Sequence, residues 1–297
     1  MERKQFGKLV SALRQDMGWT QFELSQYGGV DVATISQMER GVKKHPDPEL
    51  LLKLANVFQL TTQERRQFFL ASTGIPSDQM VRQPVAASPE ESLDPERSLN
   101  KMIGLVESLR VPAFLLDVYS DLLAINYIAF AFFQIPAELI YGAANLPGGM
   151  NVMRLIFGKS PVARSQILTH WEYYAISTMR FFREASLCYR ATPYFQYLFR
   201  TFRDPAEFPL FERYWKRVSS GEQDRDGNYE QFSYHHDSFG PLNYAVATTT
   251  CVTAQGELLM NQYNPTDDAT QDFFNQLAAQ SGIGVIRGAP WPLKEVP

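Results

Sequence analysis

The chain has 297 residues, of which 45% are apolar and 20% are charged, a balance typical of globular domains. No uncharged apolar run approaches the roughly 18 residues of a membrane span, and the N-terminus, MERKQFGKLV, is not the sequence of a signal peptide. The two isolated cysteines, Cys188 and Cys251, favour a reducing cytoplasm. The first 72 residues carry ten basic and eight acidic side chains, and the remainder carries 18 and 24. This slight asymmetry is compatible with a nucleic-acid-binding module at the N-terminus.

Apolar residues recur at helical spacing throughout residues 1–72, and the pattern predicts five helices. The predicted N-caps are Thr20, Asp31, Asp47 and Thr61. Glu23 and Glu64 each follow a threonine cap by three positions, which predicts two capping boxes. Pro48 follows Asp47 at the first helical position, where proline is well tolerated.

The stretch TQFELSQYGGVDVATISQMERG contains two short helical patterns joined at a glycine pair. Ser25 supplies a small side chain where the two helices touch, and Gly29 can take the positive φ that the turn requires. In the second pattern Ile35 and Met38 share one face, which we expect to be buried. The outer face is left with Val32, Ala33, Thr34 and Gln37. This is the arrangement of a helix-turn-helix, whose second helix enters the major groove of DNA.

With the following PDPELLLKLANVFQL, this stretch resembles the Xre or lambda-repressor-like DNA-binding family. The resemblance implies that the glutamine opening the second helix contacts a phosphate and that the start of the third helix reads bases. The predicted DNA-binding residues are Gln21, Val32, Ala33, Thr34, Gln37, Arg40, Lys43 and Lys44. Gln37 suits an adenine, and the short apolar side chains offer contacts to thymine methyl groups. We therefore expect phosphates to supply much of the affinity for double-stranded operator DNA. The alternative is a small helical bundle used for protein contact.

Residues 73–98 have the proline- and serine-rich composition of a linker, which predicts domains at 1–72 and 99–297. Beyond the linker, VPAFLLDVYSDLLAINY predicts two short strands joined by a turn, and a helical stretch follows to about residue 218. Three further strands are predicted in GEQDRDGNYEQFSYHH, PLNYAVATTTCVTA and GELLMNQYNP, and a final helix, DATQDFFNQLAAQ, is expected to close the domain. The predicted fold is therefore multidomain, an α domain followed by an α+β domain with one antiparallel sheet and a large helical insertion.

The order of these blocks resembles a PAS-type sensor domain. More specifically, the chain resembles the MmyB-like regulators, through VPAFLLDVYSDLLAINYIAFAFF, FGKSPVARSQILTHWEYYAISTMRFFREA, EFPLFERYW and YHHDSFGPLNYAVATTT. This resemblance implies a transcription regulator, expected to act as a homodimer, whose second domain holds a long-chain fatty acid or similar apolar molecule. Two alternatives remain: a PAS-like domain that serves only as a dimerisation scaffold, and one that holds haem or flavin.

The second half of the chain is unusually rich in aromatic residues, which suits an apolar ligand-binding site. An aromatic stripe at helical spacing is more often core packing, so only part of this set is expected to line a site. The candidate ligand-binding residues are Asn126, Tyr127, Phe130, Phe133, Trp171, Tyr174, Met179, Arg180, Phe182, Phe195, Phe199 and His236. A carboxylate head group would be met by Arg180, Arg183 or His236.

The sequence predicts neither a catalytic residue nor a metal site. His235 and His236 lie on a predicted strand, where neighbouring side chains point to opposite faces and cannot easily bind one metal ion. Neither cysteine has the adjacent histidine or basic cluster of an activated nucleophile. We therefore expect a regulator that is not an enzyme.

Overall fold

The computed structural model describes residues 3–43, 46–74, 94–136, 142–143, 149–159, 171–219, 231–236, 239–253 and 255–296. The chain folds into two compact units. The first unit comprises residues 1–86, 179–199 and 213–223, and the second comprises residues 87–178, 200–212 and 224–297. Two segments from the C-terminal half therefore fold together with the N-terminal helices.

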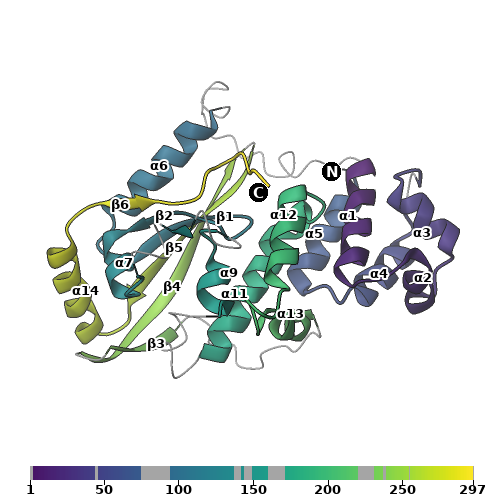
Figure 1. The fold of residues 1–297 in the computed structure, drawn as a ribbon. Coiled ribbons are helices and arrows are strands. Elements are labelled where there is room, and N and C mark those ends of the chain that lie inside the picture. Colours follow the sequence, from purple (N-terminus) through teal and green to yellow (C-terminus); the bar gives the residue numbers. More distant parts are fainter. Residues whose placement is uncertain are drawn as a thin grey trace. The chain divides into compact units, whose positions relative to one another are not determined.

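The N-terminal part of the first unit contains α1 (Arg3–Asp16), α2 (Gln21–Gly28), α3 (Val32–Glu39), α4 (Pro48–Val57) and α5 (Thr62–Ser72) (Figure 1). The predicted N-caps are confirmed, because Thr20, Asp31, Asp47 and Thr61 each accept a hydrogen bond from a backbone N–H of the following turn. Both capping boxes are also confirmed, since Glu23 and Glu64 accept the backbone N–H of their threonine. Local sequence thus determines where these helices begin.

Helices from the C-terminal half complete the first unit. They are the C-terminal part of α11 (Trp171–Ser186), the short helix η3 (Leu187–Tyr189), most of α12 (Pro193–Phe202) and most of α13 (Phe211–Ser219). Leu187 is fully buried in the same apolar core as Phe6, Leu54 and Phe68 of the N-terminal helices. The first unit is consequently larger than a helix-turn-helix domain alone.

The second unit is built on a six-stranded antiparallel sheet in the order β3-β4-β5-β1-β2-β6. Its strands are β1 (Ala113–Asp117), β2 (Leu122–Asn126), β3 (Gln231–His236), β4 (Gly240–Thr253), β5 (Gly256–Pro265) and β6 (Val285–Arg287). The first five strands, the turn between β1 and β2, and the helical insertion between β2 and β3 confirm the predicted α+β layout.

The predicted final helix is confirmed as an element, but the prediction that it closes the domain was wrong. Helix α14 (Asp268–Ser281) is followed by β6, which pairs with β2 at the edge of the sheet. Three residues are too few to show the alternation that identifies a strand in a sequence. The position of β6 is fixed instead by its pairing partner, which is distant along the chain.

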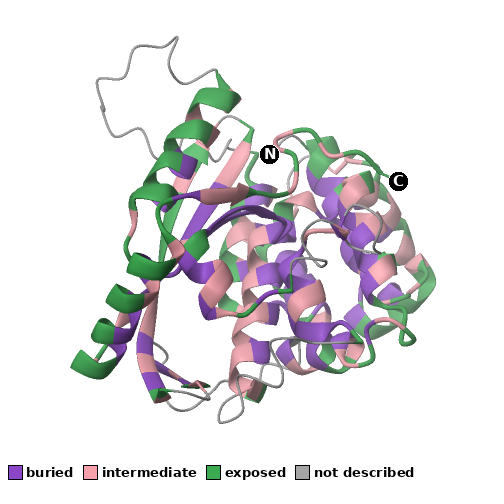
Figure 2. Ribbon diagram, turned by 60° about the vertical axis from the view of Figure 1, so that its left-hand side comes forward, coloured by how far each residue is buried: buried purple, intermediate pink, exposed green. Residues whose placement is uncertain are grey.

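The two faces of this sheet are covered differently. Helix α6 (Pro95–Ser108) packs its Met102, Ile103 and Val106 against Leu115 and neighbouring apolar residues. Phe114, which points to the opposite face because side chains alternate along a strand, contacts Phe133 and Tyr263. Helices α7 (Tyr127–Phe132) and α14 cover that second face. Figure 2 shows the burial that results, with every residue of β1 and β2 buried.

A short helix, α9 (Val152–Phe157), begins at Asn151, whose side chain caps it. Phe157 of this helix meets Trp171 and Phe211, so the second unit has aromatic contacts beyond its sheet.

Among the helices of the described residues, none is long and apolar enough to cross a lipid bilayer.

Candidate DNA-binding and ligand-binding sites

The turn between α2 and α3 has the geometry that a helix-turn-helix requires. Gly29 adopts a left-handed φ of 57° and its N–H is bonded to the carbonyl of Ser25. Ile35 and Met38 are only 1% and 3% exposed, so they anchor α3 in the core. The opposite face of the helix is therefore directed away from the core of the unit.

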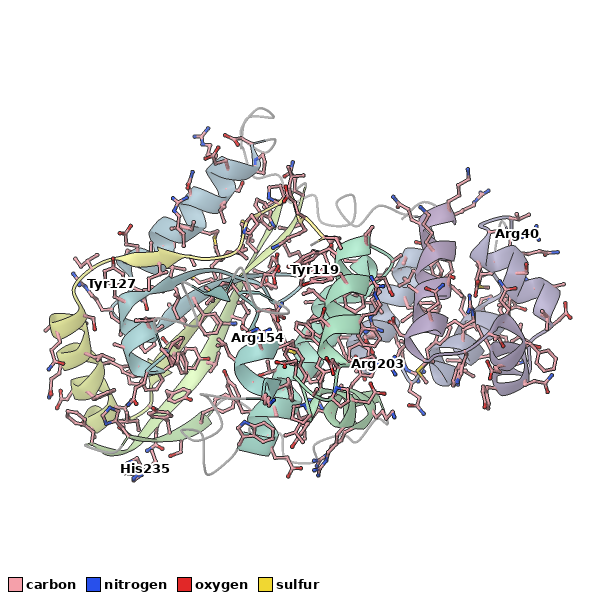
Figure 3. The ribbon with its side chains drawn as sticks, in the orientation of Figure 1. Arg40, Tyr119, Tyr127, Arg154, Arg203 and His235 are labelled. Carbon is pink, nitrogen blue, oxygen red and sulfur yellow. The ribbon has the colours of Figure 1, made fainter. Side chains whose placement is uncertain are left out.

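Four of the predicted DNA-contacting residues, Val32, Ala33, Thr34 and Gln37, belong to α3 itself, and Arg40 and Lys43 follow its end. Ala33, Gln37 and Arg40 are exposed, and Val32, Thr34 and Lys43 are half-buried. Arg40 follows the last residue of α3, and Figure 3 shows its side chain there. Lys44 lies outside the described residues. The exposed set offers one amide and one guanidinium, which suits a mixture of base and phosphate contacts.

Gln21 is held by a network that the sequence did not predict. Its Nε2 donates to Oε2 of Glu39 over 2.8 Å, and Arg14 contacts the same carboxylate through Nε at 2.7 Å and Nη2 at 3.0 Å. Arg14 also donates from Nη1 to the carbonyl of Trp19 over 2.6 Å. The network joins α1, α2 and the end of α3, so it fixes the recognition helix relative to the rest of the unit.

A buried ion cluster lies elsewhere in the first unit. The carboxylate of Glu64, from α5, accepts from Arg183 Nε at 3.1 Å and Nη2 at 2.9 Å, and it also accepts from Arg190 Nη2. Nη1 of Arg190 lies 3.5 Å from Oδ2 of Asp16, the last residue of α1. All four side chains are at most 2% exposed. The cluster therefore ties α1 and α5 to the α11–η3 segment.

The charges in this cluster compensate one another. Burial by itself raises the pKa of Glu64, but Arg183 and Arg190 outweigh that effect and hold the pKa below its ordinary value. The guanidiniums of both arginines lie over the ring of Trp215, at 4.8 and 5.0 Å from its centroid, and the Trp215 carbonyl accepts from Arg183 Nη1. Arg183 is thus engaged with the protein itself, which makes it a poor candidate for a ligand carboxylate.

The candidate ligand-binding residues are distributed over both units. Five of them belong to the first unit, where Phe182, Phe195 and Phe199 form a stacked series beside Trp215. These rings and Met179 are buried, and Arg180 is half-buried. The members of the first unit are Met179, Arg180, Phe182, Phe195 and Phe199.

In the second unit, Phe133 and Tyr174 meet in a large aromatic cluster on the sheet. Phe133 contacts Tyr263 at a centroid distance of 5.1 Å, and the hydroxyl of Tyr174 lies 3.2 Å from that of Tyr263. His236 contacts Phe273 at the edge of the same cluster, and Trp171 contacts Phe157. Phe130 is half-buried. Two of the predicted ligand-binding residues in this unit, Phe133 and Tyr174, therefore both contact Tyr263.

The structure gives Asn126 and Tyr127 other contacts. Asn126 Oδ1 accepts the backbone N–H groups of Ala113 and Ala129, and its Nδ2 donates to the carbonyl of Val111. Its amide therefore connects α7 to β1. Tyr127 is 39% exposed, and its ring lies where any side chain at Gly284 would have to go. Both residues thus organise the start of α7.

A second buried charge cluster lies in the second unit. Nζ of Lys294 lies 2.6 Å from Oδ2 of Asp117 and 2.7 Å from Oδ2 of Asp121, and Asn151 Nδ2 donates to Oδ1 of Asp121. Asp117 Oδ1 accepts the backbone N–H groups of Tyr119 and Asp121. Burial, and then the charge of Asp121, raises the pKa of Asp117 to about 6, although Lys294 opposes the rise.

Within the described parts of the chain, the histidine, cysteine and acidic side chains form no group of three or more that could hold a metal ion. His235 is exposed on β3 (Figure 3). His236 is half-buried and packs against Phe239 and Phe273.

These features define a class of protein: a helix-turn-helix DNA-binding transcription regulator that also carries an α+β ligand-binding domain. Residues 10–65 match the helix-turn-helix family model, and residues 101–277 match the model of the MmyB-like transcription regulator ligand binding domain. The second match covers more than half of the chain, so the protein belongs to the MmyB-like transcription regulators. None of the curated proteins matched the chain. Both families are regulatory, which makes an enzyme unexpected.

Proposed function

We propose that the protein acts in the cytoplasm as a homodimer and binds operator DNA through the outer face of α3. The observation that carries this proposal is the division of α3 into an anchored face and an exposed face. Ile35 and Met38 are buried, whereas Ala33 and Gln37 are exposed on the other side. In a homodimer, two such helices would read half-sites one helical turn or a multiple apart.

Few long side chains occupy the exposed face, so phosphate contacts supply much of the affinity and make it sensitive to salt. Gln37 can form a bidentate pair with adenine, which is worth about 1–3 kcal/mol of discrimination. Gln21 is positioned by Glu39, and its amide remains close to the start of α2, where a phosphate contact is expected. Arg40 and Lys43 extend the positive charge beyond the C-terminal end of α3.

The test is DNA binding to the fragment upstream of the protein's own gene, measured by fluorescence anisotropy at two salt concentrations. Gln37→Ala with Arg40→Ala should abolish specific binding without changing the unfolding temperature. Lys53→Ala is the matched control, because Lys53 is exposed on α4 and forms an ion pair with the exposed Glu49 of the same helix. Unchanged affinity in the double variant would overturn the assignment to α3. Analytical ultracentrifugation of the full chain tests the homodimer.

The second part of the proposal is that the C-terminal domain binds an apolar small molecule, with a long-chain fatty acid as the leading candidate. The support is the family match together with the aromatic cluster that contains Phe133 and Tyr174. Each buried methylene contributes about 0.8 kcal/mol, so a long alkyl chain can offset the cost of ordering it. Native mass spectrometry of the purified chain tests this point. A co-purifying lipid mass supports a receptor, a haem or flavin mass supports a cofactor-binding sensor, and an unloaded chain that takes up no added fatty acid indicates a scaffold.

We further propose that the ligand controls DNA binding by altering the relative placement of the two DNA-binding heads of the homodimer. Such control requires that the ligand bind one arrangement more tightly than another.

A further inference from the structure

The aromatic cluster of the second unit contains several buried or half-buried tyrosines, and three of them, Tyr174, Tyr244 and Tyr263, form a group of neighbours, whereas Tyr234 packs against Phe132. Tyr244 of β4 lies opposite Pro265 of β5, and Tyr263 of β5 lies opposite Val246 of β4. The two tyrosines are therefore diagonal neighbours on one face of the sheet, and their ring centroids are 5.1 Å apart. Tyr174 reaches the same place from α11, where its hydroxyl lies 3.2 Å from that of Tyr263.

Apolar rings surround these hydroxyls. Phe232 contacts both Tyr174 and Tyr244, and Phe132 contacts both Tyr244 and Tyr263. Burial raises the pKa of all three tyrosines, and the nearby tyrosine hydroxyls raise those of Tyr244 and Tyr263 further. Among the described residues, the groups that perturb these pKa values are other tyrosines, and no cation contributes. The hydroxyls are thus protonated donors in an apolar setting.

The hydroxyl of Tyr244 has no hydrogen-bond partner within the described part of the chain, although the residue is 0% exposed. An unsatisfied buried polar group costs about 1–3 kcal/mol, and most buried hydroxyls avoid that cost by finding a partner. Phenylalanine would fill the same space without the oxygen. The unused donor is therefore an indication of a partner that arrives from outside the chain.

A count of donors defines that partner. Each tyrosine hydroxyl has one proton to donate, and the bond between Tyr174 and Tyr263 uses one of the three. Two protons remain for an external group, one from that pair and one from Tyr244. Two donors can be accepted together by one oxygen that has two lone pairs, and the tyrosine oxygens can in turn accept a proton from the O–H of a carboxylic acid. Because no cation among the described residues perturbs these tyrosines, a full negative charge here would be buried at high cost.

We propose that Tyr174, Tyr244 and Tyr263 form the head-group subsite of the ligand-binding domain and receive an uncharged oxygen acceptor at the end of an apolar molecule. The acceptor is the carbonyl of an ester or ketone, or a carboxylic acid held in its protonated form. This inference rests on the proposed apolar-ligand function, and it replaces the expectation that arginine or histidine meets the head group. A fatty acid fits the site only as the neutral acid.

The experiment measures binding of three probes to the full chain by isothermal titration calorimetry: hexadecanoic acid, methyl hexadecanoate and hexadecane. Tyr244→Phe removes a single oxygen and should weaken the acid and the ester by about tenfold each while leaving hexadecane unchanged. The ligand-free variant should unfold at the same temperature as the wild type or higher, because the lost oxygen had no partner. Tyr214→Phe, at a buried tyrosine of the first unit, is the matched control and should change none of the three affinities.

The pH dependence separates the two forms of the acid. Affinity for hexadecanoic acid should fall about tenfold per pH unit above the pKa of the acid, whereas affinity for the ester should be constant. Equal affinities of wild type and Tyr244→Phe for the acid and ester would overturn the subsite while leaving the apolar-ligand function intact. Acid binding that does not change with pH would overturn the uncharged head group. If none of the probes binds the wild type, both the proposed receptor function and the subsite fail.

Discussion

Arg183 and Glu64 form a two-point ion pair in the interior of the first unit, with Nε–Oε1 and Nη2–Oε2 distances of 3.1 and 2.9 Å. Their side chains are 2% and 0% exposed. The same carboxylate closes the capping box of α5 by accepting the N–H of Thr61. One acidic side chain therefore both caps the start of α5 and holds the C-terminal part of α11 within the first unit.

Removing Arg183 should strongly destabilise the protein. Arg183→Met leaves Glu64 with Arg190 as its remaining guanidinium partner, and breaking a buried pair costs about 3–5 kcal/mol. Urea unfolding followed by circular dichroism measures the loss. Arg203→Met is the control, because its pair with Glu212 is 38% and 34% exposed and should contribute less than about 1 kcal/mol. Adding Glu64→Gln to Arg183→Met should restore part of the stability, since glutamine keeps the cap and removes the charge.

The capping box at Thr61 was predictable from the sequence, but the ion pair was not. A capping box depends on two residues three positions apart, so local spacing reveals it. Glu64 and Arg183 are 119 residues apart, and only the folded chain brings them together. The same limit applies to the proposed tyrosine subsite. Helical spacing identifies Tyr174 as one aromatic residue of a helix, but it does not show which distant residue Tyr174 contacts. Tyr263 lay in a predicted strand, where alternation predicts a face but not its neighbours.

The cluster around Lys294 should give the protein an unusual response to pH. The pKa of Asp117 is raised from 3.8 to about 6, so the folded state binds a proton more readily than the unfolded state. This group therefore makes stability fall as pH rises through that window. Lys294→Met removes the charge that opposes the rise, so the variant should be less stable at pH 7 and should regain stability at pH 5. Thermal unfolding at the two pH values tests this expectation, and a variant equally destabilised at both would contradict it.

Thr20→Ala and Thr61→Ala delete the same hydroxyl from two capping boxes and should differ in effect. Loss of a threonine N-cap costs about 1 kcal/mol. Thr20 Oγ1 also donates to Glu23 Oε2 over 2.8 Å, but that contact is exposed to solvent, so we expect Thr20→Ala to cost little more than the cap. Thr61 Oγ1 also donates to Glu184 Oε1 over 2.6 Å, so its loss leaves a half-buried carboxylate without that donor. We expect Thr61→Ala to cost at least about 1 kcal/mol more than Thr20→Ala in the free energy of unfolding. Equal losses would show that the contact with Glu184 contributes nothing.

Gly7 lets α1 approach the end of the recognition helix. A Cβ at this position would lie 2.5 Å from the carbonyl oxygen of Glu39 and 2.6 Å from that of Met38. Because these are backbone atoms, Gly7→Ala must displace the end of α3 or α1, and such overpacking costs about 1–3 kcal/mol. The displacement should also weaken operator binding, because Arg40 follows directly.

Gly104 provides the matched control for this change. It lies in α6, where an added Cβ meets nothing within 4 Å, so Gly104→Ala should stabilise the protein by about 0.5–1 kcal/mol through helix propensity alone. The unfolding temperature should therefore fall in Gly7→Ala and rise in Gly104→Ala. The affinity for promoter DNA, measured by fluorescence anisotropy, should be reduced in Gly7→Ala and unchanged in Gly104→Ala. If Gly7→Ala were as stable as Gly104→Ala and bound DNA normally, the close packing of α1 on α3 would not be what positions the recognition helix.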